Sequence, residues 1–451
     1  MGNHEQKESF RLPERQIPVF RKVDVLVCGG GPAGVGAALA AARNGASVLL
    51  IEQRGYLGGM ATVANVPAFC PYTDHVKPVI RGIGLEILED MKARMETGFQ
   101  EEWKDELDWV PIHAEALKLL LDEKMQEAGV SLLYHTFIGN VVEQDGMVEA
   151  VIIHNKTGTQ AVKANIYIDA TSDADLVYHA GGQLAQGGDE GEMQPGTMCF
   201  VLHNLDRSRF LAHVDEYGVD LKHAINKAKS DGQLNVVRDW AGISWLNDQT
   251  AGFNFGHIFG IDGSKAEDLT HGAIAGRALV HHITDWLRKN IAGFEQAFLS
   301  LTGEQVGIRE TRRIVGDYVL TSDDFQSCRS FPDDIARNAY YIDLHMANAQ
   351  SGMTMVHLPP GESHGIPYRS LLPVGIENVI AAGKCISTDR ATQGATRVMP
   401  NCFAMGEAAG TAGALLSTNG MNRTRGINIK ELQQQLVRQG AWLGEAINGA
   451  E

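Results

Sequence analysis

The sequence lacks several features that mark secreted, membrane-spanning or zinc-binding proteins. Its six cysteines are scattered and form no Cys-x-x-Cys pair, so we expect neither a disulfide framework nor a metal site. No apolar run approaches the length of a membrane span, and the polar N-terminal residues lack the apolar core of a secretory signal. We therefore expect a cytoplasmic protein that makes no membrane contact.

Positive charge is also scarce. The chain has 39 Lys and Arg against 55 Asp and Glu, a formal net charge of −16, and no long block of like charges. Such a surface repels nucleic acids and anionic lipids, so neither is expected as a partner. Glycine is abundant, at 50 of 451 residues, which suits a backbone that wraps a large cofactor, and the length suits two domains.

The most informative segment is residues 23–52. An apolar stretch leads into Gly29-x-Gly31-x-x-Gly34, an alanine-rich stretch follows, and a second apolar stretch ends at Glu52. Gly29 permits a tight turn, Gly31 lets the backbone approach a pyrophosphate, and Gly34 lets helix and strand pack closely. The helix N-terminus attracts the phosphates, and Glu52 is placed to accept hydrogen bonds from ribose hydroxyls. The order of these features predicts a strand–helix–strand unit that binds a dinucleotide.

A second glycine pair narrows the choice of dinucleotide. Gly58 and Gly59 precede Met60 and permit another close backbone approach to the ligand. NAD enzymes do not need such a pair at this place, whereas large flavoproteins usually have one. The pair therefore favours FAD over NAD, and an ordinary loop with two glycines is the alternative.

The pattern along the chain predicts an α/β protein. We expect a Rossmann-like FAD-binding domain with a parallel sheet and a small β-meander at 130–168, and an inserted α+β substrate domain. The FAD-binding domain is discontinuous. The expected boundaries are an N-terminal arm at 1–22, the FAD-binding domain at 23–190 and 376–451, and the inserted cap at 191–375. Helices are expected at 79–98, 111–129, 266–289, 401–417 and 428–446.

Two further segments have the composition of cofactor contacts. Asp169 to Asp173 reads as a strand end that closes over the pyrophosphate, or as a plain strand end with an Asx turn. Asn401 reads as the N-cap of a helix rich in Ala and Gly. That helix N-terminus would place positive potential beside the pyrimidine edge of a flavin. Tight packing of the small residues without a ligand is the alternative.

Residues 307–318 carry a cluster of charges. If this segment is a strand, Arg309 and Arg313 share one face, and their guanidinium groups can hold a carboxylate or phosphate. The alternative is a structural ladder of ion pairs that involves Glu310 and Asp317.

With these motifs the chain resembles the FAD-dependent oxidoreductase family, within the glutathione-reductase-type flavoprotein superfamily. The most specific parts are Gly-Ile-Arg-Glu-Thr-Arg-Arg-Ile-Val-Gly-Asp-Tyr at 307–318, Gly-Ile-Pro-Tyr-Arg at 365–369, and the glycine-rich stretch at 382–412. Many proteins of the superfamily have Gly-Asp where this chain has Gly383-Lys384. The resemblance implies noncovalent FAD. Together with the motifs it predicts cofactor contacts at Gly29, Gly31, Pro32, Ala33, Gly34, Glu52, Gln53, Arg54, Gly58, Gly59, Met60, Ala170, Thr171, Asp173, Gly383, Met399, Pro400 and Asn401.

The expected reaction is transfer of a hydride between a small polar organic substrate and flavin N5. Arg309 and Arg313 are the expected substrate anchors. A side chain of the inserted domain takes the remaining proton. The candidates for that catalytic group are His257, His345, His364, Tyr368 and Arg369.

Several points stay open at the level of sequence. A second strand–GxGxxG–helix unit is not evident, so a separate NADPH domain is not expected. The electron acceptor is oxygen, a quinone or a carrier protein, and a homo-oligomer is compatible with the sequence. The alternative functions are an NAD-dependent dehydrogenase and a non-redox nucleotide-binding protein.

Overall fold

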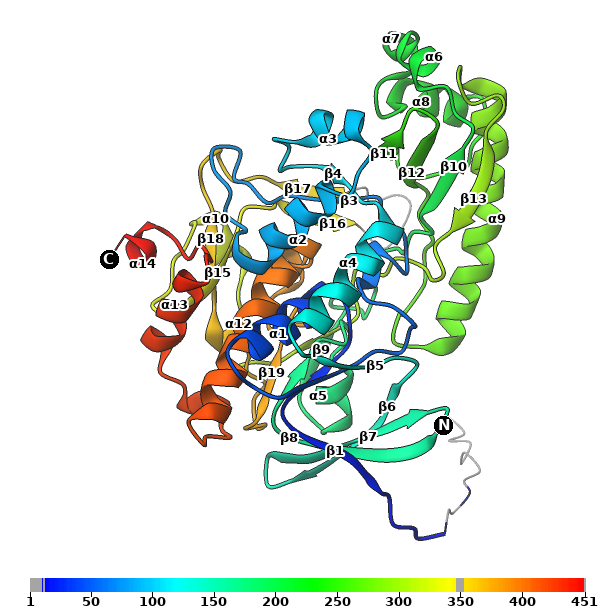
Figure 1. The fold of residues 1–451 in the computed structure, drawn as a ribbon. Coiled ribbons are helices and arrows are strands. Elements are labelled where there is room, and N and C mark those ends of the chain that lie inside the picture. The colour runs from blue at the N-terminus through cyan, green and yellow to red at the C-terminus, as the bar shows by residue number, and fades with distance from the viewer. Residues whose placement is uncertain (1–9, 11–12, 346–352, 450–451) are drawn as a thin grey trace.

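The computed structural model describes residues 10, 13–345 and 353–449. Its centre is a seven-stranded sheet in the order β5-β2-β1-β8-β7-β6, with β19 paired to the end of β8 (Figure 1). Strands β6 and β7 run antiparallel and form a meander with β8, and the other strands are parallel. The α/β class, the parallel sheet and the meander are therefore confirmed. The strands are β1 (Val19–Cys28), β2 (Val48–Ile51), β5 (Ser131–Leu133), β6 (Phe137–Gln144), β7 (Met147–Asn155), β8 (Gly158–Asp169) and β19 (Val379–Ala381).

The N-terminal segment differs in part from the expected arm. Strand β1 begins at Val19, and its first residues pair with β8 from Ala161 onward. Residues 19–22 therefore belong to the sheet, whereas residues 1–9 and 11–12 of the expected arm lie outside the described residues. The second half of β1 is buried on both faces, as expected of a central parallel strand.

Two helices pack against each other through glycines. A Cβ atom added to Gly36 of α1 (Pro32–Arg43) would lie 2.4 Å from the carbonyl oxygen of Phe403. Added to Gly406 or Gly410 of α12 (Met399–Thr418), it would lie 2.0 Å from a carbonyl oxygen of α1. The small residues of α12 therefore serve close helix packing along its length. Helices α2 (Gly82–Lys92) and α4 (Ala114–Glu127) join the same hydrophobic core.

A second hydrophobic core lies around an antiparallel sheet in the order β11-β12-β10-β13. The long helix α9 runs beside this sheet along one edge of the molecule (Figure 1). Phe200 and Phe253 stack within this core, with ring centroids 4.9 Å apart. The elements are β10 (Phe200–His203), α6 (Arg207–Leu211), α7 (Val214–Tyr217), α8 (Lys222–Ser230), β11 (Gly242–Asn247), β12 (Thr250–Asn254), α9 (Ala266–Asn290) and β13 (Phe298–Thr302).

The segment that follows returns to the first core. Leu320, Phe331, Ile366 and Tyr368 all pack in the same hydrophobic cluster as the central sheet. Residues 191–375 thus contribute to both cores, and their division into a separate inserted domain stays a prediction. The remaining elements are β3 (Ala68–Phe69), α3 (Thr97–Trp103), β4 (Val110–Pro111), α5 (Asp175–His179), β9 (Leu184–Gln186), β14 (Arg312–Ile314), α10 (Ser322–Gln326), β15 (Asp334–Asn338), β16 (Ile342–His345), β17 (Met353–Val356), β18 (His364–Pro367), α11 (Arg390–Thr396), α13 (Ile429–Arg438) and α14 (Glu445–Asn448).

Three predictions about helix ends are wrong. The helix expected at 79–98 covers Gly82–Lys92 only, and the separate helix α3 begins at Thr97. The helix expected at 428–446 stops at Arg438, because Gly440 adopts a φ of 93° that ends the helix. Asn401 is not an N-cap, because α12 begins at Met399 with Pro400 in its first turn, where proline costs no hydrogen bond. In the part of the chain that is described, no helix is long and apolar enough to cross a membrane.

Candidate cofactor and substrate site

One cavity of about 520 Å³ opens along the carboxyl ends of the parallel strands. Loops that follow four strands line it, at 29–31 after β1, 52–54 after β2, 170–173 after β8 and 382–384 after β19. Ligands of parallel α/β sheets bind at this edge, where the connections from neighbouring strands diverge. The strand ends therefore bring together segments that are more than three hundred residues apart.

The three glycines of the first turn serve different purposes. A Cβ atom on Gly29, whose φ is 104°, would lie 2.4 Å from the Ala170 carbonyl oxygen. A Cβ atom on Gly34 would lie 1.8 Å from the Gly29 carbonyl oxygen. On Gly31 it would meet only the Cα atom of Gly59, at 3.8 Å. Gly29 and Gly34 are therefore needed for packing, and Gly31 leaves the open space that a pyrophosphate requires.

Glu52 is held by backbone amides beside this turn. Its Oε2 accepts a hydrogen bond from Gly30 N at 2.6 Å, and its Oε1 accepts one from Arg54 N at 2.8 Å. Burial raises the pKa of Glu52, and the two amide bonds oppose that effect. Each carboxylate oxygen can accept a second hydrogen bond, and the contact of Glu52 with ribose hydroxyls stays a prediction.

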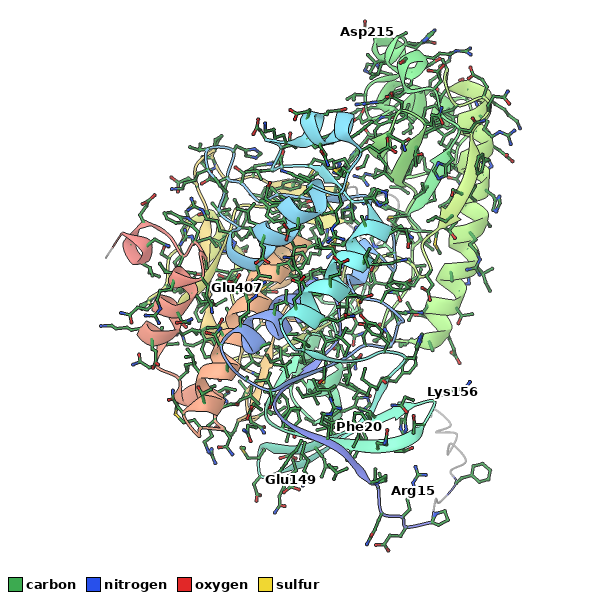
Figure 2. All side chains as sticks on the ribbon, viewed as in Figure 1. Arg15, Phe20, Glu149, Lys156, Asp215 and Glu407 are labelled. Atoms are coloured by element: carbon green, nitrogen blue, oxygen red, sulfur yellow. The ribbon has the colours of Figure 1, made fainter. Side chains whose placement is uncertain are left out.

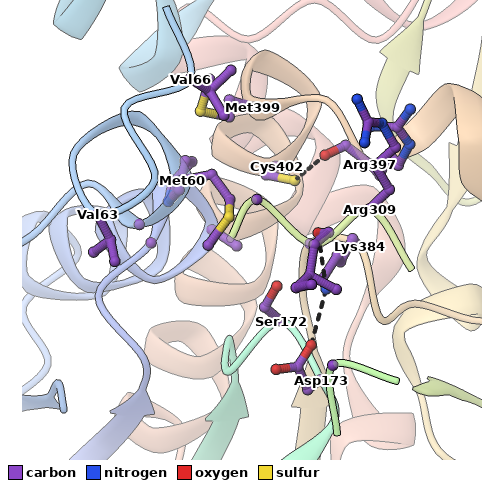
Figure 3. Close-up of a pocket in the computed structure, with 18 of the residues that line it drawn as sticks. Met60, Val63, Val66, Ser172, Asp173, Arg309, Lys384, Arg397, Met399 and Cys402 are labelled. Atoms are coloured by element: carbon purple, nitrogen blue, oxygen red, sulfur yellow. Dashed lines mark hydrogen bonds and ion pairs between the residues drawn. The ribbon is translucent and has the colours of Figure 1, made fainter. Parts of the chain in front are cut away.

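Lys384 stands beside the loop that follows β8. Its Nζ lies 2.9 Å from Asp173 Oδ1, which also accepts a hydrogen bond from Thr311 Oγ1 at 2.6 Å (Figure 3). Burial and the neighbouring carboxylates Asp173 and Asp169 raise the pKa of Asp175 to about 7. Lys384 thus supplies positive charge to a crowded group of carboxylates at the cavity wall.

Most of the predicted cofactor residues meet at this cavity. Those that line it are Gly29, Gly31, Pro32, Ala33, Glu52, Gln53, Arg54, Gly59, Met60, Ala170, Thr171, Asp173, Gly383 and Met399. Gly34, Gly58, Pro400 and Asn401 are not among the lining residues. The Asn401 side chain donates instead to Asn338 Oδ1 and to the Ala395 carbonyl oxygen at 3.1 Å, so it supports the wall from behind. The cavity therefore gathers glycine turns, backbone amides and the Glu52 carboxylate, which are groups that a dinucleotide can contact.

At its other end the cavity becomes strongly cationic. Arg238, Arg309 and Arg397 line this part, which we call the arginine chamber, together with Asp343 and His345. Arg397 Nη2 lies 2.8 Å from Asp343 Oδ2. The side chains of Arg309 and Arg397 lie close together in Figure 3.

The charges of the arginine chamber are poorly balanced. Burial lowers the pKa of Arg238 to about 9 and that of Arg309 to about 10, and neighbouring arginines add to both shifts. Guanidinium groups with such values still carry their charge at neutral pH. The chamber therefore has a positive potential that a bound anion would offset.

His345 is the one predicted catalytic residue that lines the cavity. Its Nε2 lies 3.1 Å from Asp343 Oδ1, and burial next to Arg309 lowers its pKa to about 3. Asp343 Oδ1 has no hydrogen-bond partner among the described residues, so this is a close charge contact rather than an aligned hydrogen bond, and we assign the ring proton to Nε2 because it faces the carboxylate. Nδ1 is then a proton acceptor, and it has no hydrogen-bond partner among the described residues. The ring of His257 packs edge-on against His345, with centroids 4.8 Å apart, but does not line the cavity.

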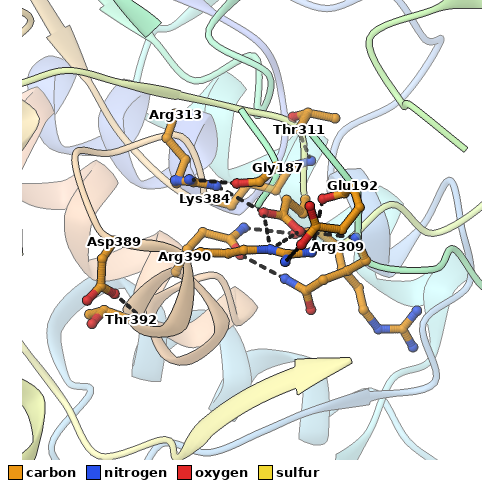
Figure 4. A network of polar contacts seen from close by, with 12 residues as sticks. Gly187, Glu192, Arg309, Thr311, Arg313, Lys384, Asp389, Arg390 and Thr392 are labelled. Atoms are coloured by element: carbon orange, nitrogen blue, oxygen red, sulfur yellow. Dashed lines mark hydrogen bonds and ion pairs between the residues drawn. The ribbon is translucent and has the colours of Figure 1, made fainter. Parts of the chain in front are cut away.

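The two arginines predicted as substrate anchors do not act together. Strand β14 covers Arg312–Ile314 only, so Arg309 precedes it and the predicted shared strand face is wrong. Arg313 turns toward the buried carboxylate of Glu310, at 3.0 Å, which also pairs with Arg390 (Figure 4). Arg313 therefore belongs to the ion-pair network that was the alternative, whereas Arg309 lines the cavity.

The other catalytic candidates lie away from the cavity. Tyr368 is buried and donates to the Thr424 carbonyl oxygen at 3.2 Å. Arg369 is half-exposed and pairs with Asp333 at 2.9 Å, and His364 is buried against Asn338. None of the three is among the lining residues, so their positions give a catalytic role no support.

The chain matches the FAD dependent oxidoreductase family over residues 24–436. An NADH oxidase of Thermoanaerobacter brockii is 36% identical over 87 residues, which are 18% of this chain and 13% of that protein. A digeranylgeranylglycerophospholipid reductase of Methanospirillum hungatei is 29% identical over 154 residues, 33% of this chain and 38% of that protein. The matched regions thus span less than half of the length of either curated relative.

Solved structures are similar over nearly the whole chain at low identity. A geranylgeranyl bacteriochlorophyll reductase-like protein from Thermoplasma acidophilum has a TM-score of 0.46 and 13% identity, covering 95% of this chain and 87% of its own. A p-nitrophenol 4-monooxygenase from Pseudomonas putida has a TM-score of 0.44 and 11% identity, covering 95% and 89%.

Proposed function

The chain belongs to the FAD-dependent oxidoreductase family, and from that premise we propose that it transfers a hydride between a small polar organic substrate and N5 of the flavin. The observation that carries this proposal is the continuity of the cavity. The dinucleotide cradle at Gly31 and the arginine chamber at Arg309 line the same space. A substrate in the chamber can therefore reach a cofactor that lies along the strand ends.

Family membership makes the cofactor FAD and sets aside the two alternatives, an NAD-dependent dehydrogenase and a non-redox nucleotide-binding protein. We propose that Gly31 and Gly59 admit the pyrophosphate and that Glu52 accepts from the ribose. When bound, FAD supplies the site that accepts or returns a hydride. The N-terminus of α12, at Met399, adds positive potential at the cavity wall.

We propose that His345 handles the proton. Oxidation of a substrate CH–OH or CH–NH group releases a hydride, which carries both electrons, and a proton. His345 Nδ1 takes the proton, while Asp343 Oδ1, 3.1 Å from Nε2, offsets the positive charge that the ring then carries. Reduction of a substrate uses the same groups in reverse. Arg309 anchors the substrate, and His257 supports the His345 ring from behind.

Four wider proposals accompany this mechanism. The glycine pair at Gly58 and Gly59 supports a place in the glutathione-reductase-type superfamily. Residues 191–375 stay the proposed cap over the substrate, and the second hydrophobic core, which draws mainly on residues 198–306, supports this for that part of the segment. All six cysteines are described as free thiols, which supports a reducing cytoplasm. The electron acceptor is oxygen, a quinone or a carrier protein.

The first test is the absorption spectrum of the purified protein and the identity of the cofactor released on denaturation. We expect the two bands of oxidised flavin and a stoichiometric amount of FAD. Gly31→Val should fold but lose FAD, because its side chain would enter open space that the cofactor needs. Gly98→Val is the matched control, since an added Cβ there meets no atom within 4 Å and lies outside the cavity. Full flavin occupancy in Gly31→Val would contradict the proposed cradle.

A further inference from the structure

We infer that the substrate is a carboxylate on a flat, unsaturated or aromatic skeleton, and that Arg238, Arg309 and Arg397 bind its carboxylate group. This inference rests on the proposed function, because it names the substrate class of the same cavity. It goes beyond a single anchoring arginine in two respects. It assigns two further arginines to the substrate, and it assigns the neighbouring aromatic rings to the rest of the molecule.

The balance of charges in the arginine chamber supports a substrate carboxylate. Three guanidinium groups face one carboxylate, that of Asp343, and the neutral ring of His345 adds no charge. Arg309 Nη1 donates to neutral oxygens only, the Pro195 carbonyl at 2.7 Å and Thr197 Oγ1 at 3.0 Å. Among the described residues neither Arg238 nor Arg309 has a carboxylate partner within salt-bridge distance. The chamber therefore carries more positive than negative charge.

The hydrogen-bond donors of the chamber are also incompletely used. Arg238 donates from Nη1 to the Asn254 carbonyl oxygen at 3.2 Å. The Nε atoms of Arg238 and Arg397 are buried and have no partner within the described part of the chain. Unpaired buried donors are costly, and a carboxylate accepts several such bonds at once. A neutral ligand satisfies fewer of them and leaves the net charge unchanged.

The aromatic rings that line the same cavity support a flat, unsaturated or aromatic substrate skeleton. Trp109, Trp240, Tyr340 and Tyr341 all line the cavity. The guanidinium carbon of Arg238 lies 3.1 Å from the centroid of the Trp240 ring, so this arginine is stacked and fixed in orientation. The centroids of Tyr340 and Tyr341 are 4.2 Å apart. Flat unsaturated groups pack well against such rings, whereas saturated rings present bulk without a π face.

The position of His345 is consistent with an anionic substrate. Arg309 and Arg397 both lower the pKa of His345 in the free protein. A carboxylate bound between these arginines offsets their charge, so His345 becomes a stronger base when substrate is present. Substrate binding would thus prepare the proton acceptor for its step.

The test is a binding titration of the FAD-loaded protein, followed by the flavin difference spectrum. The probes are sodium benzoate and trans-cinnamate. Benzamide and cinnamamide are the uncharged control ligands, and cyclohexanecarboxylate is the saturated control ligand. We expect each aromatic carboxylate to bind about tenfold to hundredfold more tightly than its amide, as charged hydrogen bonds imply. Benzoate should also bind several-fold more tightly than cyclohexanecarboxylate. Amides that bind as tightly as the acids, or no response to either acid at millimolar concentration, would overturn the inference.

Variants localise the effect. Arg238→Lys and Arg397→Lys keep the charge but remove the planar fork, and each should weaken benzoate binding about tenfold with FAD retained. Arg209→Lys, on a surface pair with Glu295, is the matched control and should bind normally. If both chamber variants bound benzoate as tightly as the control, Arg238 and Arg397 would not bind the substrate carboxylate, and their assignment would be wrong. The comparison of acid with amide on the unaltered protein needs no variant and stands even if a variant fails to fold.

Failure of this inference is distinguishable from failure of the proposed function. If the protein were yellow and its flavin reducible but it showed no preference for carboxylates, the proposed function would stand and the proposed substrate class would be rejected. A protein without FAD would lose the function. A titration followed by tryptophan fluorescence would then report whether the chamber still selects carboxylates, since two of the six tryptophans, Trp109 and Trp240, line the cavity.

Discussion

A buried carboxyl group far from the strand-end loops gives the most quantitative prediction. Glu407 lies on α12 where that helix meets α2, and only 1% of its surface is exposed (Figure 2). Its Oε2 accepts a hydrogen bond from Ile83 N at 2.9 Å, while Oε1 has no partner among the described residues. Burial raises the pKa of Glu407 from 4.5 to about 8. The side chain is therefore protonated in the folded protein at neutral pH.

This raised pKa makes stability depend on pH. The folded protein holds the proton more tightly than the unfolded chain, so the added stability is fully present below pH 4.5 and is lost as pH rises to about 8. A pKa difference of 8 − 4.5 = 3.5 corresponds to about 5 kcal/mol in total, at about 1.36 kcal/mol for each tenfold change. Roughly 3 kcal/mol of this falls between pH 5 and pH 8.

Glu407→Gln removes the titration and keeps an oxygen that can accept from Ile83 N. We expect the free energy of unfolding of the variant, relative to the unaltered protein, to rise by about 3 kcal/mol from pH 5 to pH 8. Urea unfolding of both FAD-loaded proteins at several pH values measures this difference. Glu431→Gln removes the same charge from an exposed position on α13 and should follow the unaltered protein. If the free energies of unfolding of Glu407→Gln and of the unaltered protein changed in parallel with pH, Glu407 would be ionised in the folded state. That result would refute the reasoning.

Two further predictions concern the carboxylates beside the cofactor. Lys384→Met should raise the dissociation constant of FAD about tenfold or more, because the carboxylate of Asp173 then stays without its cation at the wall of a cavity that is proposed to bind an anionic cofactor; fluorescence titration checks this, with exposed Lys156→Met as the control. Asp175, with a pKa raised to about 7, loses its proton between pH 6 and pH 8 and then repels the pyrophosphate. FAD should therefore bind about tenfold more tightly at pH 6 than at pH 8, and Asp175→Asn should abolish this dependence.

Local signals explain which parts of the structure were predictable. The order of Gly29, Gly31, Gly34 and Glu52 identifies the first strand, turn, helix and second strand, because each residue meets a requirement of its own segment. The helix at 401–417 was predictable from its run of Ala, Leu, Met and Glu, which are good helix formers, although its glycines serve the packing against α1. Its starting point was not, because Asn and Pro near a helix start both favour a helix N-terminus. Here Pro400 lies in the first turn and Asn401 one residue further on.

The arginine chamber shows why other parts of the site could not be predicted from the sequence. Arg238 follows α8, Arg309 precedes β14, and Arg397 ends α11, so three distant segments each provide one guanidinium group. No spacing within any one segment signals that they meet. A strand periodicity applied to residues 307–318 paired Arg309 with Arg313, because it assumed a strand where the chain forms one only from Arg312. In the folded protein Arg313 is paired with Glu310, whereas Arg309 lines the cavity. Because the Glu310 carboxylate keeps Arg313 out of the cavity, only Arg309 of this pair contributes its charge to the site.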